Sequence, residues 1–374
     1  MFIASEKLIA ALALACAGLT AHAQPAPRRA AQPRPAEQAQ EPLKAAWVYG
    51  PEPVSAQWAS QRDQARQQAL LHLAPKVQTM ALPNGAQSAA DAERLLRDLV
   101  RQGQQIIFTH GLTYMPAVMK VAAECPGVKF ECLACLETAP NVAVANIRFY
   151  EGRYLAGIAA GRMSESGQIG YVAAFPVPQV LQGINAFALG ARSVAPQAQI
   201  KVIWLGSWFD PPRERDAAMT LMSQGADVLA HHTASIATVS AAEERGKLAV
   251  AYHVDLSAVA PHAQLLADTP QWSGYTNARL QAALEGTWQS QRLWGGIREG
   301  MLSVGHFGPR LPEAVRREVL ARQADIAQGR LHPFTGPLHD NTGRQALPAG
   351  QTLTDQQLAE MHWLAEGVQG TLQR

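Results

Sequence analysis

"LVRQGQQIIFTH" (99–110) and "LMSQGADVLAHH" (221–232) begin 122 residues apart and share a leucine, a Gln-Gly pair and a final histidine. Each has the pattern of a helix end, a glycine that terminates the helix, and a buried strand. "APKVQTMAL" (74–82) and "APQAQIKVI" (195–203) repeat at nearly the same distance and have the pattern of a helix-to-strand turn. The order of elements therefore occurs twice along the chain.

The two halves predict an α/β fold with two lobes. The apolar segments "AAWVYG" (45–50) and "IGYVAAF" (169–175) each precede a loop with proline and then a helical stretch. Strands that alternate with helices form parallel sheets covered on both faces. We expect two Rossmann-like lobes joined by a hinge, with a ligand cleft between them where the carboxyl ends of the strands meet.

The composition is that of a globular protein, with 374 residues, 48% hydrophobic and 17% charged, and a net charge of +2. This charge is too small, and the basic residues too scattered, to predict nucleic-acid binding. We divide the chain into a signal peptide (1–23), a disordered linker (24–42), lobe 1 (43–147, completed by about 263–310), lobe 2 (148–262) and C-terminal helices that pack on the lobes (311–374).

The N-terminal segment predicts export to the periplasm or another extracytoplasmic space. Lys7 precedes an apolar run that ends at Leu19, and the small-x-small site 21–23 follows, as in a secretory signal peptide. Lipid attachment at Cys16 is an alternative to cleavage after Ala23. No later segment has the roughly 18 apolar residues that a membrane span needs.

Three cysteines remain after the signal peptide: Cys125, Cys132 and Cys135. One pair can bridge in an oxidising compartment and leave one thiol free, and the sequence leaves the pairing open. Cys132 and Cys135 form C-x-x-C within an expected strand, away from a helix N-terminus that would lower a thiol pKa. This placement favours a structural role over redox catalysis.

Two tryptophans are expected at the cleft. In "VIWLGSWFDPPRERDAA" (202–218), a strand leads to Trp208, and then to Asp210 as helix N-cap with Pro211 as the first helical residue. The corresponding loop of the first half, "GPEPVSAQW" (50–58), ends in Trp58. One ring from each lobe could hold a flat ligand between them. Packing at the base of each loop is the alternative.

Several segments together resemble the basic-membrane-protein family of ABC-transporter solute-binding proteins. They are "RFYEGRYLAGIAAGRM" (148–163), "IGYVAAFPVPQVLQGINAFALGARSVAP" (169–196), "WFDPPRERDAA" (208–218) and "HPFTGP" (332–337). The resemblance runs from about residue 43 to 370. It implies a type I periplasmic-binding fold, a purine base or nucleoside as ligand, and an ABC permease in the membrane as partner.

The resemblance also implies ligand-binding residues. Trp58 and Trp208 match the aromatic side chains that stack on the base, and Asp255 in "AYHVDLSAVAP" matches an acidic contact that accepts hydrogen bonds. Trp272 falls where the chain crosses back to the first lobe and is expected to line the cleft. We include His253 among the ligand-binding residues. A solvated turn is the alternative for Asp255.

The chain departs from the family in three places. Loop 50–58 lacks the acidic, glycine-rich pattern of close relatives, Ala234 stands where an Asp is common, and His253 stands where Asn is more usual. Lost acids remove acceptors for amino or hydroxyl donors, so the ligand can differ from the family's usual one.

We expect capture by hinge closure, in which a monomer closes on a ligand that touches both lobes. The crossings are expected near 145–150, 260–272 and beyond 300. No enzyme motif occurs, and we expect no catalysis, cofactor or metal. The alternatives are a ligand-binding module for a membrane sensor, a nucleoside hydrolase that uses Asp255 with His253, and a metal site at His231, His232 and His253.

Overall fold

The computed structural model describes residues 41–372 apart from 51–56, 84 and 87. The predicted signal peptide, Cys16, nearly all of the linker and most of loop 50–58 lie outside the described residues. In the described part of the chain, none of the helices has the length and apolar character of a membrane span.

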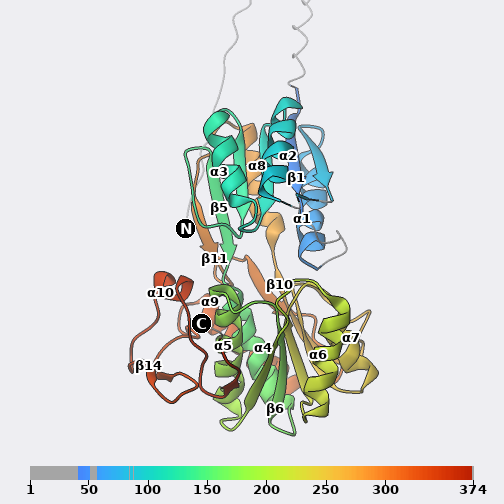
Figure 1. The fold of residues 1–374 in the computed structure, drawn as a ribbon, viewed down its shortest axis with the longest axis vertical. Helices are drawn as coiled ribbons and strands as arrows, with labels where there is room; N and C mark the ends of the chain where they lie inside the picture. The colour runs from blue at the N-terminus through green and yellow to red at the C-terminus, as the bar shows by residue number, and fades with distance from the viewer. Residues whose placement is uncertain (1–40, 51–56, 84, 87, 373–374) are drawn as a thin grey trace, which may run out of the picture. The chain divides into compact units, whose positions relative to one another are not determined.

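The first sheet has six strands in the order β11-β5-β4-β3-β1-β2, all parallel. Its strands are β1 (Leu43–Val48), β2 (Val77–Leu82), β3 (Ile106–His110), β4 (Lys129–Leu133), β5 (Val142–Ile147) and β11 (Arg292–Gly295). The helices of this lobe are α1 (Gln57–Leu73), α2 (Ala89–Arg101), α3 (Met115–Glu124) and α8 (Trp272–Leu284) (Figure 1).

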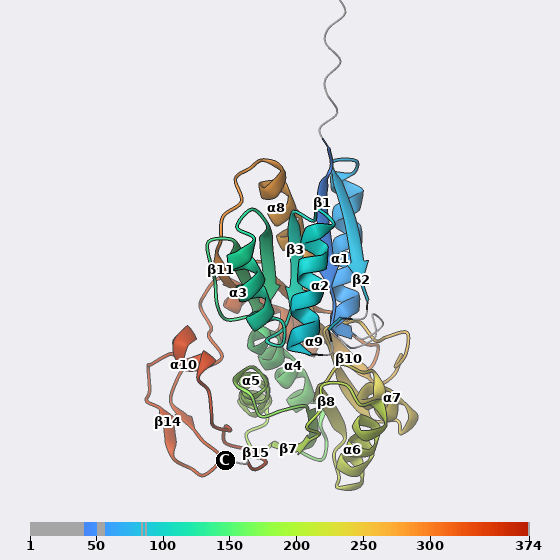
Figure 2. The same cartoon turned by 45° about the horizontal axis from the view of Figure 1, so that its top comes forward.

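The second sheet has seven strands in the order β12-β10-β9-β8-β6-β7-β15, and only β12 is antiparallel to its neighbour. The strands are β6 (Gln168–Ala173), β7 (Gln199–Trp204), β8 (Val228–His232), β9 (Leu248–Tyr252), β10 (Gln264–Pro270), β12 (Leu302–Gly305) and β15 (Val368–Gln369). The helices are α4 (Phe149–Met163), α5 (Pro178–Val194), α6 (Pro211–Ser223), α7 (Ala237–Glu244), α9 (Glu313–Ala327) and α10 (Asp355–Ala359) (Figure 2).

The sequence repeat is visible in the topology. In each sheet the first strand lies between the second and the third, and the fourth and fifth follow in order. Strands β3 and β8 begin 122 residues apart, and the glycines that precede them, Gly103 and Gly225, have φ angles of 80° and 97°. This left-handed conformation suits glycine after a helix end. The two-lobed α/β prediction is confirmed.

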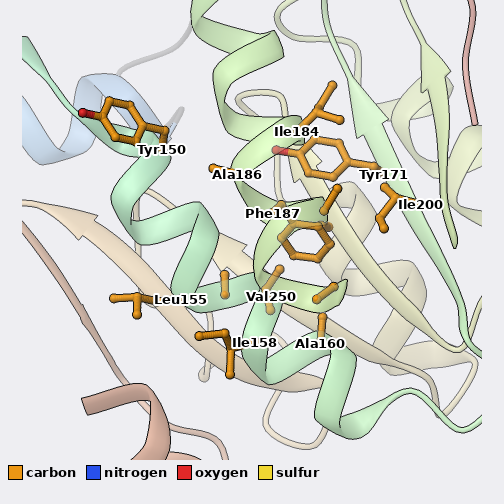
Figure 3. Close-up of a cluster of buried hydrophobic side chains, with 14 of the residues drawn as sticks. Tyr150, Leu155, Ile158, Ala160, Tyr171, Ile184, Ala186, Phe187, Ile200 and Val250 are labelled. Carbon is orange, nitrogen blue, oxygen red and sulfur yellow. The ribbon is translucent and has the colours of Figure 1, made fainter. Parts of the chain in front are cut away.

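Each sheet buries both faces, as its continuous apolar strands require. In β1, Ala46 and Val48 pack with α2 and α3, whereas Ala45 and Trp47 pack on the opposite face with α1 and α8. In the second lobe, α4 and α5 pack on one face around residues such as Tyr171, Phe187, Ile200 and Val250 (Figure 3). Helices α6 and α7 cover the other face.

The chain passes between the two sheets three times. The crossings lie between β5 and α4, between β10 and α8, and between β11 and β12. The expected completion of lobe 1 by about 263–310 was too broad, because β10 pairs with β9 and β12 pairs with β10 in the second sheet. Only α8 and β11 of that range belong with the first sheet.

The C-terminal helices expected over 311–374 form only in part, because α9 ends at Ala327 and α10 is a short helix. Thr354 caps α10 in a capping box with Gln357, and this helix ends at Ala359. Beyond it, the Asn185 side chain on α5 donates to the Trp363 carbonyl and accepts from the Ala365 amide. Those contacts and the pairing of β15 with β7 hold the backbone in a non-helical path. A hairpin of β13 (Leu338–His339) and β14 (Gln345–Leu347) precedes it.

Candidate functional site

Trp58 and Trp208 meet between the two lobes. Trp58 lies in the first turn of α1, and Trp208 lies in the loop between β7 and α6, where Asp210 caps α6 by accepting from the Arg213 amide. The ring centroids are 5.5 Å apart, with the rings inclined at 67°, edge to face. Phe175 packs 5.2 Å from the Trp208 ring. A flat ligand between parallel rings needs about 7 Å, twice a carbon–carbon contact, so the rings must separate and turn to admit one.

His253 belongs to the same aromatic group. Its ring lies 5.7 Å from Trp58, 4.5 Å from Phe149 and 4.1 Å from Tyr252. The side chain is buried, and its backbone has a φ of 68°, a left-handed conformation rare outside glycine. Its amide donates to the carbonyl of Asp268, which helps hold this conformation. Burial lowers the pKa of His253 well below its usual value, and Arg62 and nearby histidines add to the effect, so the imidazole is neutral.

Asp255 forms the turn after β9 and also borders a cavity. Its carboxylate accepts from the Ser257 amide and hydroxyl, both at 2.9 Å, and from Gln264 Nε2 at 2.8 Å. Partial burial raises its pKa, but these hydrogen bonds outweigh burial and leave the pKa below its usual value. The cavity has a volume of about 460 Å³ and is lined by both lobes: Ser60, Gln61 and Gln64 of α1, and Ile236, Val254, Asp255, Leu256, Thr269, Gln271 and His306.

Trp272 does not join the aromatic pair. It is the first residue of α8, only 6% exposed, and packs in an apolar cluster with Tyr275, Phe149 and Tyr252. The structure therefore places Trp272 in the core beside the crossing from β10 to α8.

A buried polar network lies beneath the site in the second lobe. Arg153 of α4 donates to Asp268 of β10 at 2.8 Å, and both side chains are fully buried. Three aromatic rings surround the guanidinium, including Tyr252 at 5.1 Å. The Tyr252 hydroxyl lies 3.2 Å from His232 Nε2. Burial lowers the pKa of His232 to about 3, so this imidazole also stays neutral.

Asp255 and His253 lie close in the chain but in different surroundings. Asp255 and His253 contact different partners, so they do not form a hydrogen-bonded acid/base pair. Among the residues that the structure describes, no three His, Cys, Asp or Glu side chains are arranged to hold a metal ion.

Cys132 and Cys135 are joined in a disulfide at the end of β4, and Cys125 is the free thiol in this part of the chain.

Sequence reasoning missed Arg62, His110, Phe149 and Phe175. The sequence repeat indicates one of these residues, His110, because it ends β3 as His232 ends β8. Burial lowers the pKa of His110 well below its usual value, with Arg62 adding to the effect. Nothing in a single sequence indicates that Phe149, at the first crossing, lies 4.5 Å from His253.

Comparison with known proteins accounts for this architecture. The model of the family described as ABC transporter substrate-binding protein PnrA-like matches residues 58–332. The chain belongs to this family. The PnrA-like proteins are substrate-binding components of ABC transporters, which act outside the cytoplasm with a small-molecule ligand and a membrane permease.

Two curated relatives cover most of the chain. A purine-binding protein of Brucella abortus is 42% identical over 337 residues, which span 90% of this chain and 96% of the relative. A putative ABC transporter glucose-binding protein of Haloferax volcanii is 33% identical over 330 residues, 88% of this chain and 81% of the relative. Both similarities extend over the two lobes that form the aromatic site.

Solved structures show the same fold at low identity. A solute-binding protein from Conexibacter woesei has a TM-score of 0.65 at 18% identity and covers 78% of this chain and 98% of its own. A transcriptional activator of the comK gene from Bacillus halodurans has a TM-score of 0.67 at 21% identity, with 78% and 99% coverage. The expected type I periplasmic-binding fold of this PnrA-like protein is confirmed.

Proposed function

We propose that this ABC-transporter substrate-binding protein captures a purine base or nucleoside between Trp58 and Trp208. The observation that carries the proposal is the contact of these two rings, one from each lobe. Each lies near the carboxyl end of a strand, where ligands of open parallel sheets bind. The 42% identity with a purine-binding protein supports a purine as the ligand.

The geometry supports closure about the three crossings. A ligand between the rings touches both lobes and stabilises the closed form through contacts that the open form lacks. His253 lies at the edge of the pair, and Asp255 borders the cavity that continues from α1 to the loops of the second lobe. Trp272 contributes by packing at the crossing and not by stacking.

We propose that the signal peptide 1–23 directs export into the periplasm, with lipid attachment at Cys16 as the alternative. The protein then functions as a monomer that binds its ligand without altering it chemically. Incubation with nucleosides tests the last point, since released base or sugar would indicate hydrolysis. Co-purification with a permease separates this role from a membrane sensor.

Isothermal titration against purines, nucleosides, pyrimidines and sugars tests the ligand. Trp208→Ala is expected to weaken purine binding by about 1–3 kcal/mol, the range for stacking of a base on an aromatic side chain. Trp363→Ala is the matched control, since Trp363 is also half-buried on the second lobe but packs at the C-terminal segment. Equal affinity of Trp208→Ala and wild type would refute stacking. Binding of glucose in place of purines would instead favour a sugar ligand, the kind named for the putative glucose-binding relative from Haloferax volcanii.

A further inference from the structure

His253 has unused hydrogen-bonding capacity at the aromatic pair. Nδ1 of its ring is buried and has no hydrogen-bonding partner among the residues that the structure describes. The same holds for Nε1 of Trp58, whose ring lies 5.7 Å from His253. Buried polar atoms are rarely left unpaired, because an unmade hydrogen bond costs about 1–3 kcal/mol. Both atoms are therefore available to hydrogen-bond a ligand.

The strained backbone of His253 points the same way. A φ of 68° in a non-glycine residue is an outlier that persists only where the surrounding structure fixes it. Here the Asp268 carbonyl holds the amide, and the rings of Phe149 and Tyr252 hold the imidazole. Such outliers gather at ligand-binding positions.

The hydrogen-bonding group beside the aromatic pair is the neutral imidazole of His253 and not a free carboxylate. Asp255 lies two residues along the chain, and its carboxylate accepts from Ser257 and Gln264. Asp268, whose backbone carbonyl accepts from the His253 amide, pairs its carboxylate with Arg153. Arg62 and His110 of the first lobe, and His231 and His232 of the second, add positive or neutral groups around His253. A carboxylate only accepts hydrogen bonds, whereas a neutral imidazole has one donor and one acceptor nitrogen, exchanged by a change of tautomer.

We propose that His253 hydrogen-bonds the group at the six-position of the purine, and that its two tautomers allow one site to bind both 6-amino- and 6-oxopurines. This inference rests on the proposed function. Adenine presents a donor at its six-position, and hypoxanthine presents an acceptor there. One tautomer of His253 accepts from the amino group, and the other donates to the oxo group. The transporter would then import both classes of purine.

Titration calorimetry at pH 8 with adenine, hypoxanthine and unsubstituted purine tests the specificity. Wild type is expected to bind adenine and hypoxanthine within about tenfold of each other. His253→Asp keeps only acceptors and should shift the ratio at least tenfold towards adenine, whereas His253→Asn keeps a donor and an acceptor and should leave both bases bound. Asp and Asn both tolerate the left-handed backbone, so they are matched.

A second measurement uses the unaltered protein. ¹⁵N NMR of the imidazole nitrogens should show opposite tautomers of His253 in the adenine and hypoxanthine complexes. The same tautomer in both complexes, discrimination beyond a hundredfold by wild type, or an unchanged ratio in His253→Asp would each overturn the inference. Binding of adenine alone would do so while leaving the proposed function intact, and the failure of every purine to bind would remove the proposed function itself.

Discussion

Replacement of Asp268 by Asn tests the ion pair that joins α4 to β10. Both side chains of this pair are 0% exposed, and the Arg153 guanidinium is enclosed by the rings of Tyr171, Phe187 and Tyr252. Burial raises the pKa of Asp268 to about 6, because Arg153 only partly offsets it, so the pair is charged at pH 7.5. Asp268→Asn leaves a buried charge without its partner, which costs about 3–5 kcal/mol.

The matched control lies on the same helix. Arg162 of α4 pairs with Glu318 at 2.9 Å, but these side chains are 43% and 28% exposed, and such pairs contribute about 0–1 kcal/mol. Urea unfolding at pH 7.5 should show the large loss for Asp268→Asn and almost none for Glu318→Gln. A loss below about 1 kcal/mol for Asp268→Asn would refute the reasoning, since it would mean that the guanidinium finds water or another partner.

Two other variants test the crossings. Burial raises the pKa of Glu151 to about 7, so its ionised form is disfavoured in the folded protein. The free energy of unfolding should therefore fall by about 3 kcal/mol as pH rises from about 4.5 to 7. Urea unfolding of Glu151→Gln should lack this pH dependence. A Glu151→Gln protein with the wild-type pH profile would contradict this assignment. Trp272→Ala removes a side chain from the core and should destabilise by about 3–5 kcal/mol, as measured by thermal unfolding; normal stability with lost purine binding would instead make Trp272 a ligand contact.

Local patterns predicted most of the fold because the same elements occur in both halves. The glycines at 103 and 225 and the strands that follow them were placed correctly, and so was the cap at Asp210. The C-terminal segment could not be predicted, because its apolar spacing fits a helix while the contacts that decide its path come from Asn185, distant in sequence.

The site was predictable only in part. The meeting of Trp58 and Trp208 follows from the loop positions at the carboxyl ends of the strands. The side-chain environments do not follow, because they depend on tertiary packing. His253 is enclosed by residues from other elements, and Trp272 is buried by the crossing that it begins.

The pairing of β15 with β7 has a consequence for how the protein is made. Val368 and Gln369 pair along the outer side of β7, so they complete a sheet whose first strand begins 200 residues earlier, at residue 168. Until those residues are synthesised, β7 presents unpaired amides and carbonyls to any passing strand, a common start of aggregation. Truncation before Val368 would leave this edge of β7 exposed.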